Sequence, residues 1–274
     1  MAVMDAELHI KEGRLDEALS SLMSAIRSKP EDPALRVFLF ELASLLGQLD
    51  RALNQLRVLE NMGKETQMLA KVFERVLQGE FLRAQVFAGK TTPLIFGEPE
   101  EWVSWLVQAC ALTVQGRSDE AKALRIRARD LAPPNPGKVN GKPFQWLMDA
   151  DSRFGPTLEV IIGGSYYWVP FHRIKRIQCE KPSGLRDVVW FPAQFTWING
   201  GEMAGHVPVR YPGTELSKDG QLKLARCSDW VTQPDGSQFG LGQRLLATDT
   251  EDVPLLELRD LEFDLPPQPP QDHA

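Results

Sequence analysis

A short pattern that recurs four times in the first half of the chain limits its fold more than any other feature. Each copy spans six residues, beginning with a glycine and ending with an alanine, and the first reads Gly-Arg-Leu-Asp-Glu-Ala. The copies begin at Gly13, Gly47, Gly79 and Gly116, so successive glycines are 34, 32 and 37 residues apart. A period near 34 residues is typical of the tetratricopeptide repeat, a helix–turn–helix unit. The pattern therefore predicts a stack of antiparallel helix pairs.

The residue types in the pattern suit a turn between two helices. Glycine can take the left-handed conformation that ends the first helix, and aspartate near the start of the second helix favours its positive end. Alanine lets the two helices approach closely. The third copy is degenerate, because its second helix runs into Gly89-Lys-Thr-Thr-Pro93 and residues 89–101 form a longer connection. We expect about four helix pairs in residues 1–131, above the three or so that a stable stack needs.

The pattern changes after residue 131. Prolines 133, 134 and 136, followed by two glycines, predict a Pro/Gly linker over residues 132–144. Alternation with a period of two then predicts strands, at residues 157–162, 166–171, 187–191 and 194–198, the last two joined at Pro192-Ala193. We expect a small β-rich domain over residues 145–265 and a disordered Pro-rich tail over 266–274. The predicted fold class is α+β, with tetratricopeptide-like helical repeats ahead of the β-rich domain.

Composition excludes several classes of function. The net charge of −6 and the pI near 5.4 argue against a protein that binds nucleic acid or an anionic membrane through a basic surface. No apolar run approaches the 18 or so residues that a membrane span needs, and the N-terminus lacks the features of a signal peptide. Three widely spaced cysteines suit a reducing compartment. We therefore expect a cytoplasmic protein.

The sequence contains no recognisable catalytic or metal-binding motif. Gly163-Gly164-Ser165 lacks the G-x-S-x-G spacing of a nucleophile turn and predicts a tight hairpin. No histidine pair or Cys-x-x-Cys is present, so we predict no metal and no cofactor, although His172, His206, Cys179 and Cys227 could converge in space. Four aromatic side chains are expected to fill the core of the β domain: Trp146, Trp168, Trp190 and Trp197.

One carboxylate cluster leaves two interpretations open. Asp149 and Asp151, followed by Arg153, could do acid–base chemistry. Such a cluster more often forms an ion pair at a domain boundary, and we favour that structural role. The catalytic alternative is an enzyme with its site around Asp149, Asp151 and His172.

Four motifs in the second half resemble the C-terminal domain of the ImpE (TagJ) family. They are Asp149-x-Asp151-x-Arg153-x-Gly155-Pro156-x-Leu158-Glu159, Gly164-x-Tyr166-x-Trp168-Val169-Pro170, Leu185-Arg186-Asp187-x-x-Trp190 and Arg210-Tyr211-Pro212-Gly213. The resemblance covers nearly the whole chain, since tetratricopeptide-like repeats ahead of this domain are also the family layout. It offers no catalytic residue, and the matched glycines, prolines, tryptophans and carboxylate–arginine cluster are expected to be architectural.

The resemblance implies a non-enzymatic adaptor of the bacterial type VI secretion system. Members of this family are understood to bind the N-terminal helix of the small sheath subunit. They act near the AAA+ ATPase that disassembles the contracted sheath, and direct contact with that ATPase stays open. A scaffold of helical repeats that binds some other protein is the alternative within the non-enzymatic class.

A repeat stack offers a concave surface to such a helix. The first helix of each pair lines this surface, and an amphipathic partner helix can lay its apolar face there. Placing each pattern glycine at position 15 of its repeat predicts the groove positions, namely Val37, Glu41, Leu69, Phe73, Val103 and Leu106. These side chains could instead pack between neighbouring helices, and the junction with the β domain is an alternative binding surface.

Overall fold

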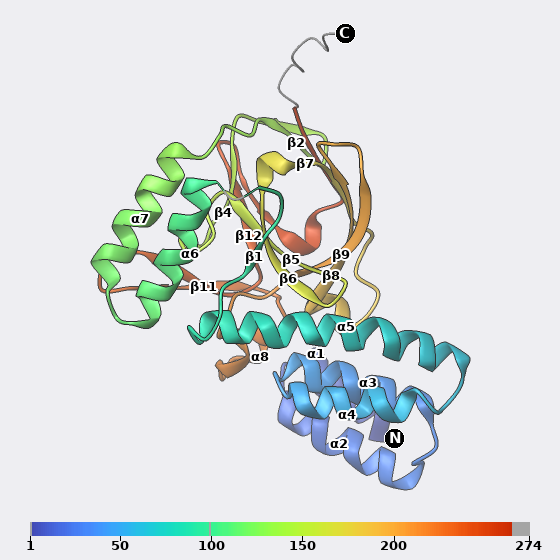
Figure 1. Cartoon of the computed structure of the whole chain (residues 1–274). Helices are drawn as coiled ribbons and strands as arrows, with labels where there is room; N and C mark the ends of the chain where they lie inside the picture. Colours follow the sequence, from blue (N-terminus) through green and yellow to red (C-terminus); the bar gives the residue numbers. More distant parts are fainter. Residues whose placement is uncertain (1, 99, 265–274) are drawn as a thin grey trace.

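The computed structural model describes residues 2–98 and 100–264, and it combines a helical N-terminal part with a β-rich C-terminal part (Figure 1). This is the α+β class that the sequence predicts. The helices of the first part are α1 (Ala2–Lys11), α2 (Leu15–Ser28), α3 (Pro33–Leu45), α4 (Leu49–Leu59), α5 (Lys64–Phe87), α6 (Glu101–Val114) and α7 (Ser118–Leu131). None of these described helices is long and apolar enough to cross a membrane.

Three copies of the repeated pattern form the predicted helical hairpins, α1–α2, α3–α4 and α6–α7. Their glycines, Gly13, Gly47 and Gly116, have φ values of 80°, 71° and 73°, in the left-handed region that ends a helix without steric cost only for glycine. The pattern alanines of these hairpins are fully buried, so the paired helices approach each other closely, as predicted.

The third copy does not form a helical hairpin, so the prediction of about four helix pairs is wrong. Gly79 lies inside α5, a single helix of 24 residues. Its glycine is required by packing: an added Cβ would lie 2.4 Å from Cγ2 of Ile161 on the β domain. The chain leaves α5 at Gly89 (φ 70°) and makes the short strand β1 (Leu94–Ile95) before α6. The helical part is therefore three helix pairs and one long helix.

The β-rich part contains one large sheet and two small ones. Its strands are β2 (Gly137–Val139), β3 (Lys142–Phe144), β4 (Leu147–Asp149), β5 (Thr157–Ile162), β6 (Ser165–Pro170), β7 (Ile174–Gln178), β8 (Trp190–Trp197), β9 (Glu202–Pro208), β10 (Ser228–Thr232), β11 (Gln238–Gly242), β12 (Leu245–Thr248), β13 (Asp252–Pro254) and β14 (Asp260–Phe263). The nine-stranded sheet has the order β1-β6-β5-β9-β8-β7-β14-β2-β3. The smaller sheets are β10-β11 and β13-β12-β4. Figure 1 shows α5 lying across the base of this domain, between it and the first two helix pairs.

Short helices interrupt the strands at four turns and before β10. They are η1 (Phe171–Arg173), η2 (Leu185–Val188), η3 (Thr214–Leu216), η4 (Leu255–Glu257) and α8 (Gly220–Lys223). The segment from residue 213 to 226, which includes η3 and α8, faces the helical part of the chain.

Two boundaries differ from the sequence-based expectation. Residues 132–144 are not a free linker, because β2 and β3 lie within them and pair in the large sheet. The expected strands at 187–191 and 194–198 are replaced by one strand, β8, which begins at Trp190 because residues 187 and 188 belong to η2. It passes through Pro192 with its register against β9 intact. The tail at 266–274 lies outside the described residues.

The predicted hairpin at Gly163-Gly164 joins β5 to β6, with φ values of 60° and 95° at the two glycines. Trp168, Trp190 and Trp197 are at most 4% exposed, and of these Trp197 lies in the core of the β domain, as predicted. Trp146 is the exception at 39% exposed, because it lies on the turn between β3 and β4. One apolar cluster runs from the helices into the β domain through Trp168 and Trp190, so the two parts share a core.

Replacing Gly79 with alanine tests the packing of α5 on the β domain. Alanine normally stabilises a helix interior by up to about 1 kcal/mol relative to glycine. Here the clash with Ile161 should reverse the sign, lowering the free energy of unfolding by at least about 1 kcal/mol in urea titrations. In an Ile161→Ala background the same change should be neutral or stabilising. A Gly79→Ala protein more stable than the wild type would contradict the packing role.

Candidate functional site

A buried ion network joins α5 to the β domain. Arg83 of α5 donates from Nε to Oε1 of Glu159 on β5 at 2.6 Å, and from Nη2 to Oε2 at 3.2 Å. Arg244 reaches the same carboxylate from the other side, and the hydroxyl of Tyr166 donates to it. Tyr166 in turn accepts from the indole of Trp168 at 2.7 Å. Glu159, Tyr166 and Trp168 are therefore all hydrogen-bonded at the centre of the interface.

The carboxylates of the first family motif extend this network. Asp149 accepts from Arg244 and from the hydroxyl of Tyr211, at 3.0 Å for the latter. Asp151 pairs with Arg153 and accepts from the backbone N–H of Gly240 at 2.7 Å. Both aspartates are buried. These contacts fit the structural role that we favoured for the cluster.

The structure does not bring the proposed catalytic group together. His172 lies in a separate cluster, where its Nε2 is 2.8 Å from Glu100 and where Arg173 also binds that carboxylate. Burial lowers the pKa of His172 by more than the negative charge of Glu100 raises it. Asp149 and Asp151 are committed to Arg244 and Arg153 instead. No group of three or more metal-ligating side chains occurs within residues 2–98 and 100–264.

The network shifts the pKa values of its carboxyl groups in opposite directions. Burial raises the pKa of Glu159, but the guanidinium groups of Arg83 and Arg244 outweigh burial and hold it at about 2. Burial raises the pKa of Asp149 to about 6, against the charge of Arg244. Glu159 is therefore the charged hub of the network at neutral pH.

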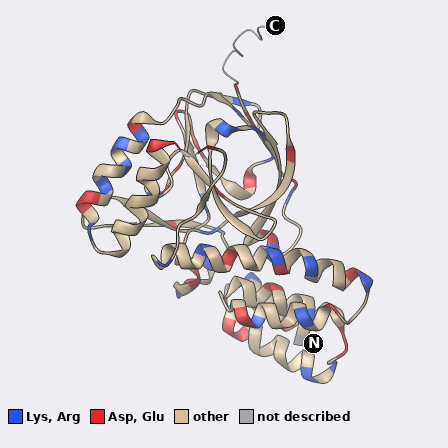
Figure 2. Cartoon of the chain, in the orientation of Figure 1, with Lys and Arg blue, Asp and Glu red and all other residues tan. Residues whose placement is uncertain are grey.

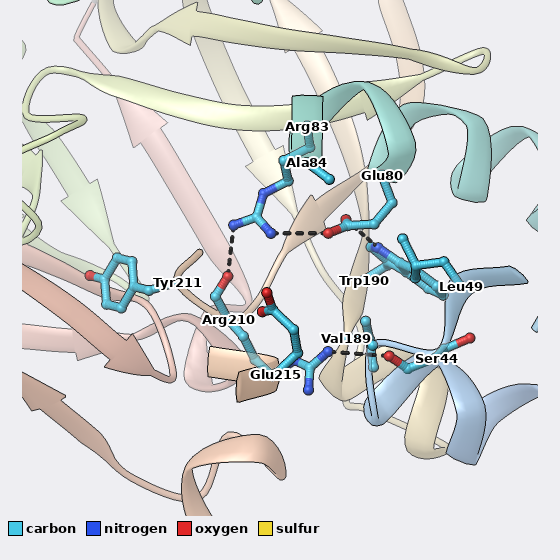
Figure 3. Close-up of a pocket in the computed structure, with 11 residues that line it drawn as sticks. Ser44, Leu49, Glu80, Arg83, Ala84, Val189, Trp190, Arg210, Tyr211 and Glu215 are labelled. Atoms are coloured by element: carbon cyan, nitrogen blue, oxygen red, sulfur yellow. Dashed lines mark hydrogen bonds and ion pairs between the residues drawn. The ribbon is translucent and has the colours of Figure 1, made fainter. Parts of the chain in front are cut away.

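A cavity of about 150 Å³ lies beside this network, between α3, α5 and the β domain (Figure 3). Glu80 accepts from the indole of Trp190 at 2.8 Å and from Arg83 at 3.0 Å. Arg210 donates to the backbone carbonyls of Leu45 at 2.6 Å and Lys223 at 3.0 Å, so it caps the C-terminal ends of α3 and α8. Other groups of the protein thus engage Glu80, Arg83 and Arg210, and the cavity is part of the interface between the helices and the β domain.

The turns of the first two helix pairs dock on the segment from 213 to 226. Arg226 donates to the carbonyl of Lys11 at 2.7 Å, capping α1 as Arg210 caps α3. An added Cβ on Gly13 would lie 2.7 Å from Gln221, and one on Gly47 would lie 2.7 Å from Glu215. These two glycines thus serve both the turn and the contact with the β domain.

A more open groove of about 480 Å³ lies between α1, α3 and the η2 turn. Helices α1 and α3 are the first helices of the first two pairs, the ones that line the concave side of a repeat stack. The lining is mostly apolar and comprises Val3, Glu7, Ile10, Lys11, Ala34, Leu35, Phe38, Glu41, Gly184 and Leu185. We call it the α1–α3 groove.

Of the six predicted groove residues, only Glu41 lines the α1–α3 groove, where it pairs with Arg186 at 3.1 Å. Val37 and Leu69 are half-buried on α3 and α5 and lie outside it. Phe73, Val103 and Leu106 are at most 7% exposed, so the prediction that they face a partner is wrong. Phe73 packs against Phe40 and Trp190 because α5 turns this face toward the β domain.

Sequence reasoning missed the α1 side of the groove. Val3, Glu7 and Ile10 recur at the spacing of one helix face. That periodicity was a usable signal in the first repeat. Leu185 lies more than 140 residues beyond Glu41 of α3 in the sequence, so no local sequence pattern indicated that it lines the groove.

Known proteins are similar to this chain over nearly its whole length. The model of the ImpE protein family matches residues 141–262, and a tetratricopeptide-repeat model matches residues 9–71. The type VI secretion system accessory component TagJ of Pseudomonas aeruginosa is 41% identical over 261 residues, covering 95% of this chain and 92% of that protein. The chain belongs to the ImpE family. The resemblance read from the four motifs is confirmed.

The fold of this ImpE-family chain is also similar to a solved structure. An X-ray crystal structure of a Vibrio parahaemolyticus protein superposes with a TM-score of 0.87, at 26% sequence identity. The match covers 94% of this chain and 97% of that one. The helical repeats and the β domain therefore occur in the same arrangement in both proteins.

Removing the Tyr166 hydroxyl tests the network in the ImpE domain. Tyr166→Phe takes one donor from Glu159 and leaves the buried Trp168 indole without its acceptor, so it should lower the free energy of unfolding by about 1–3 kcal/mol. The neighbouring Tyr167→Phe, whose ring packs against Phe96 outside the network, should have little effect. Urea unfolding of both proteins compares them. If both variants lose the same free energy of unfolding, the Tyr166 hydroxyl makes no specific contribution to stability.

The depressed pKa of Glu159 predicts the pH dependence of stability. The ordinary pKa is 4.5 and the folded value is about 2, so the ionised carboxylate stabilises the fold fully above pH 4.5. This contribution, about 3 kcal/mol, is lost as the pH falls from 4.5 toward 2. The difference in unfolding free energy between wild type and Glu159→Gln should be large at pH 5 and shrink as the pH falls below 4.5. A difference that stays constant to pH 3 would contradict the assignment.

Proposed function

We propose that this protein is a non-enzymatic adaptor of the bacterial type VI secretion system that holds an amphipathic partner helix in the α1–α3 groove. The observation that carries the proposal is this groove, with its apolar floor on the concave side of the repeats. The relationship to an accessory component of that system supplies the context. An adaptor needs a binding surface and no reactive group, and the engagement of Asp149, Asp151 and Arg153 in buried contacts supports a role in stability for that cluster.

The partner that we propose is the N-terminal helix of the small sheath subunit. A ten-residue helix such as α1 is about 15 Å long, so the groove has room for about three turns of a partner helix. The adaptor would act in the bacterial cytoplasm, near the AAA+ ATPase that disassembles the contracted sheath.

The charge distribution favours a protein partner. Figure 2 shows both signs of charge along the helices, in keeping with the net charge of −6 for the chain. Such a surface does not attract nucleic acid or an anionic membrane. A helix that buries roughly 600–800 Å² on each side through a few apolar anchors would bind with a Kd on the order of micromolar.

A charge placed on the groove floor tests the site. Phe38→Glu should weaken binding of a synthetic peptide of the sheath subunit's N-terminal helix at least about tenfold, because it puts a carboxylate against the apolar face of the peptide. Val58→Glu is the matched control: Val58 is a 40% exposed apolar residue on α4, outside the groove, and its variant should bind normally. Isothermal titration calorimetry measures both, with thermal unfolding as the check on folding.

Two results would contradict the proposal. Normal binding by folded Phe38→Glu would place the site elsewhere on the molecule. Equal co-purification of the sheath subunit with and without its first ~25 residues, a length sufficient for a helix, would exclude its N-terminal helix. If the sheath subunit fails to bind at all, the chain is a repeat scaffold for a different protein.

A further inference from the structure

The β domain supplies one wall of the α1–α3 groove. Gly184 and Leu185, at the start of the η2 turn, line it together with the two helices. Helix α5 packs against α4, and its Phe73 contacts Phe40 of α3, so α5 follows the second pair as the first helix of a third pair would. The η2 turn packs against α3 as well. The turn of the ImpE domain thus adds to the groove a wall that α1 and α3 do not provide.

The contacts of the turn hold it in a defined position. Asp187 accepts from the backbone N–H of Ser183 at 2.7 Å and from its hydroxyl at 2.9 Å. Arg186 donates to Glu41 of α3 at 3.1 Å, and its guanidinium lies 5.4 Å from the ring centroid of Phe73. Leu185 is therefore fixed relative to both α3 and α5.

We propose that the Leu185-Arg186-Asp187 turn is the specificity-determining wall of the groove, with Leu185 touching the bound helix and Arg186 neutralising Glu41 beneath it. This inference rests on the proposed function and assigns the ImpE domain a direct part in it. Asp187 is a positioning residue, because it acts through the shape of the turn.

The charges along the groove define the chemistry of the helix that fits. Glu7 and Lys11 are exposed and one helical turn apart on α1. They complement a basic and an acidic residue that are one turn apart on the border of the partner's apolar face. Glu41 is already compensated by Arg186 at the other wall, and burial raises the pKa of its carboxyl. The partner therefore presents only apolar side chains beside Glu41 and Leu185.

Calorimetry with the sheath-subunit peptide and the full-length protein tests this wall. Leu185→Ala should weaken binding about tenfold by removing an apolar anchor. Arg186→Gln should weaken it about fivefold, because Glu41 is left as an unpaired carboxylate beside the apolar face. The double variant Glu41→Gln/Arg186→Gln should recover most of that loss, a result that general damage to the fold cannot produce. Lys181→Gln, an exposed residue before the turn, is the control and should bind normally.

The outcomes separate this inference from the proposed function. If wild type does not bind the peptide, both are overturned. If wild type binds, Phe38→Glu weakens binding, and Leu185→Ala and Arg186→Gln bind normally, the helical groove stands and the wall is overturned. If Leu185→Ala does not fold, the single and double variants of Glu41 and Arg186 provide the test. A double variant that binds the peptide no more tightly than Arg186→Gln overturns the role of that pair.

Discussion

The buried pairing of Arg83 with Glu159 is the constraint on which the arrangement of the molecule depends. Both side chains are removed from water, and Glu159 is the carboxylate that Arg83 and Arg244 share, so its removal would leave two buried guanidinium groups without this partner. Arg83 belongs to α5 and Glu159 to β5. The pair therefore fixes the long helix against the large sheet. Through α5 it also sets where the first two helix pairs lie relative to the η2 turn.

The β domain stabilises the ends of two helices of the repeats. Arginines at 210 and 226 cap the C-terminal ends of α3 and α1, where backbone carbonyls have no partner within the helix. Of these contacts, Arg210 lies in one of the four motifs, and the motifs also contain Asp149, Tyr166 and Trp168 of the buried network. The interface between the helices and the β domain also positions Leu185 in the α1–α3 groove.

The repeated pattern shows how far local sequence can predict this structure. At Gly13, Gly47 and Gly116 the glycine, the following helix start and the buried alanine all have local causes, and the predicted hairpins form. Gly79 has the same local sequence signal and a different cause, the approach of Ile161 from a strand 82 residues later. The same distinction explains the groove. Positions counted along the repeat included Glu41, which lines the α1–α3 groove, but Phe73, Val103 and Leu106 are buried.

The sequence by itself determined the fold class, the turns of three helix pairs and the tight hairpin after β5, because each depends on backbone preferences and periodicities within a few residues. The family followed from the resemblance of the four motifs. Tertiary structure alone decided that α5 is one continuous helix and that residues 137–144 belong to the sheet. It also decided that the open groove lies between α1, α3 and η2. These outcomes depend on which side chains far apart in the sequence come into contact, and on the need of buried charges for partners. No local sequence pattern predicts either.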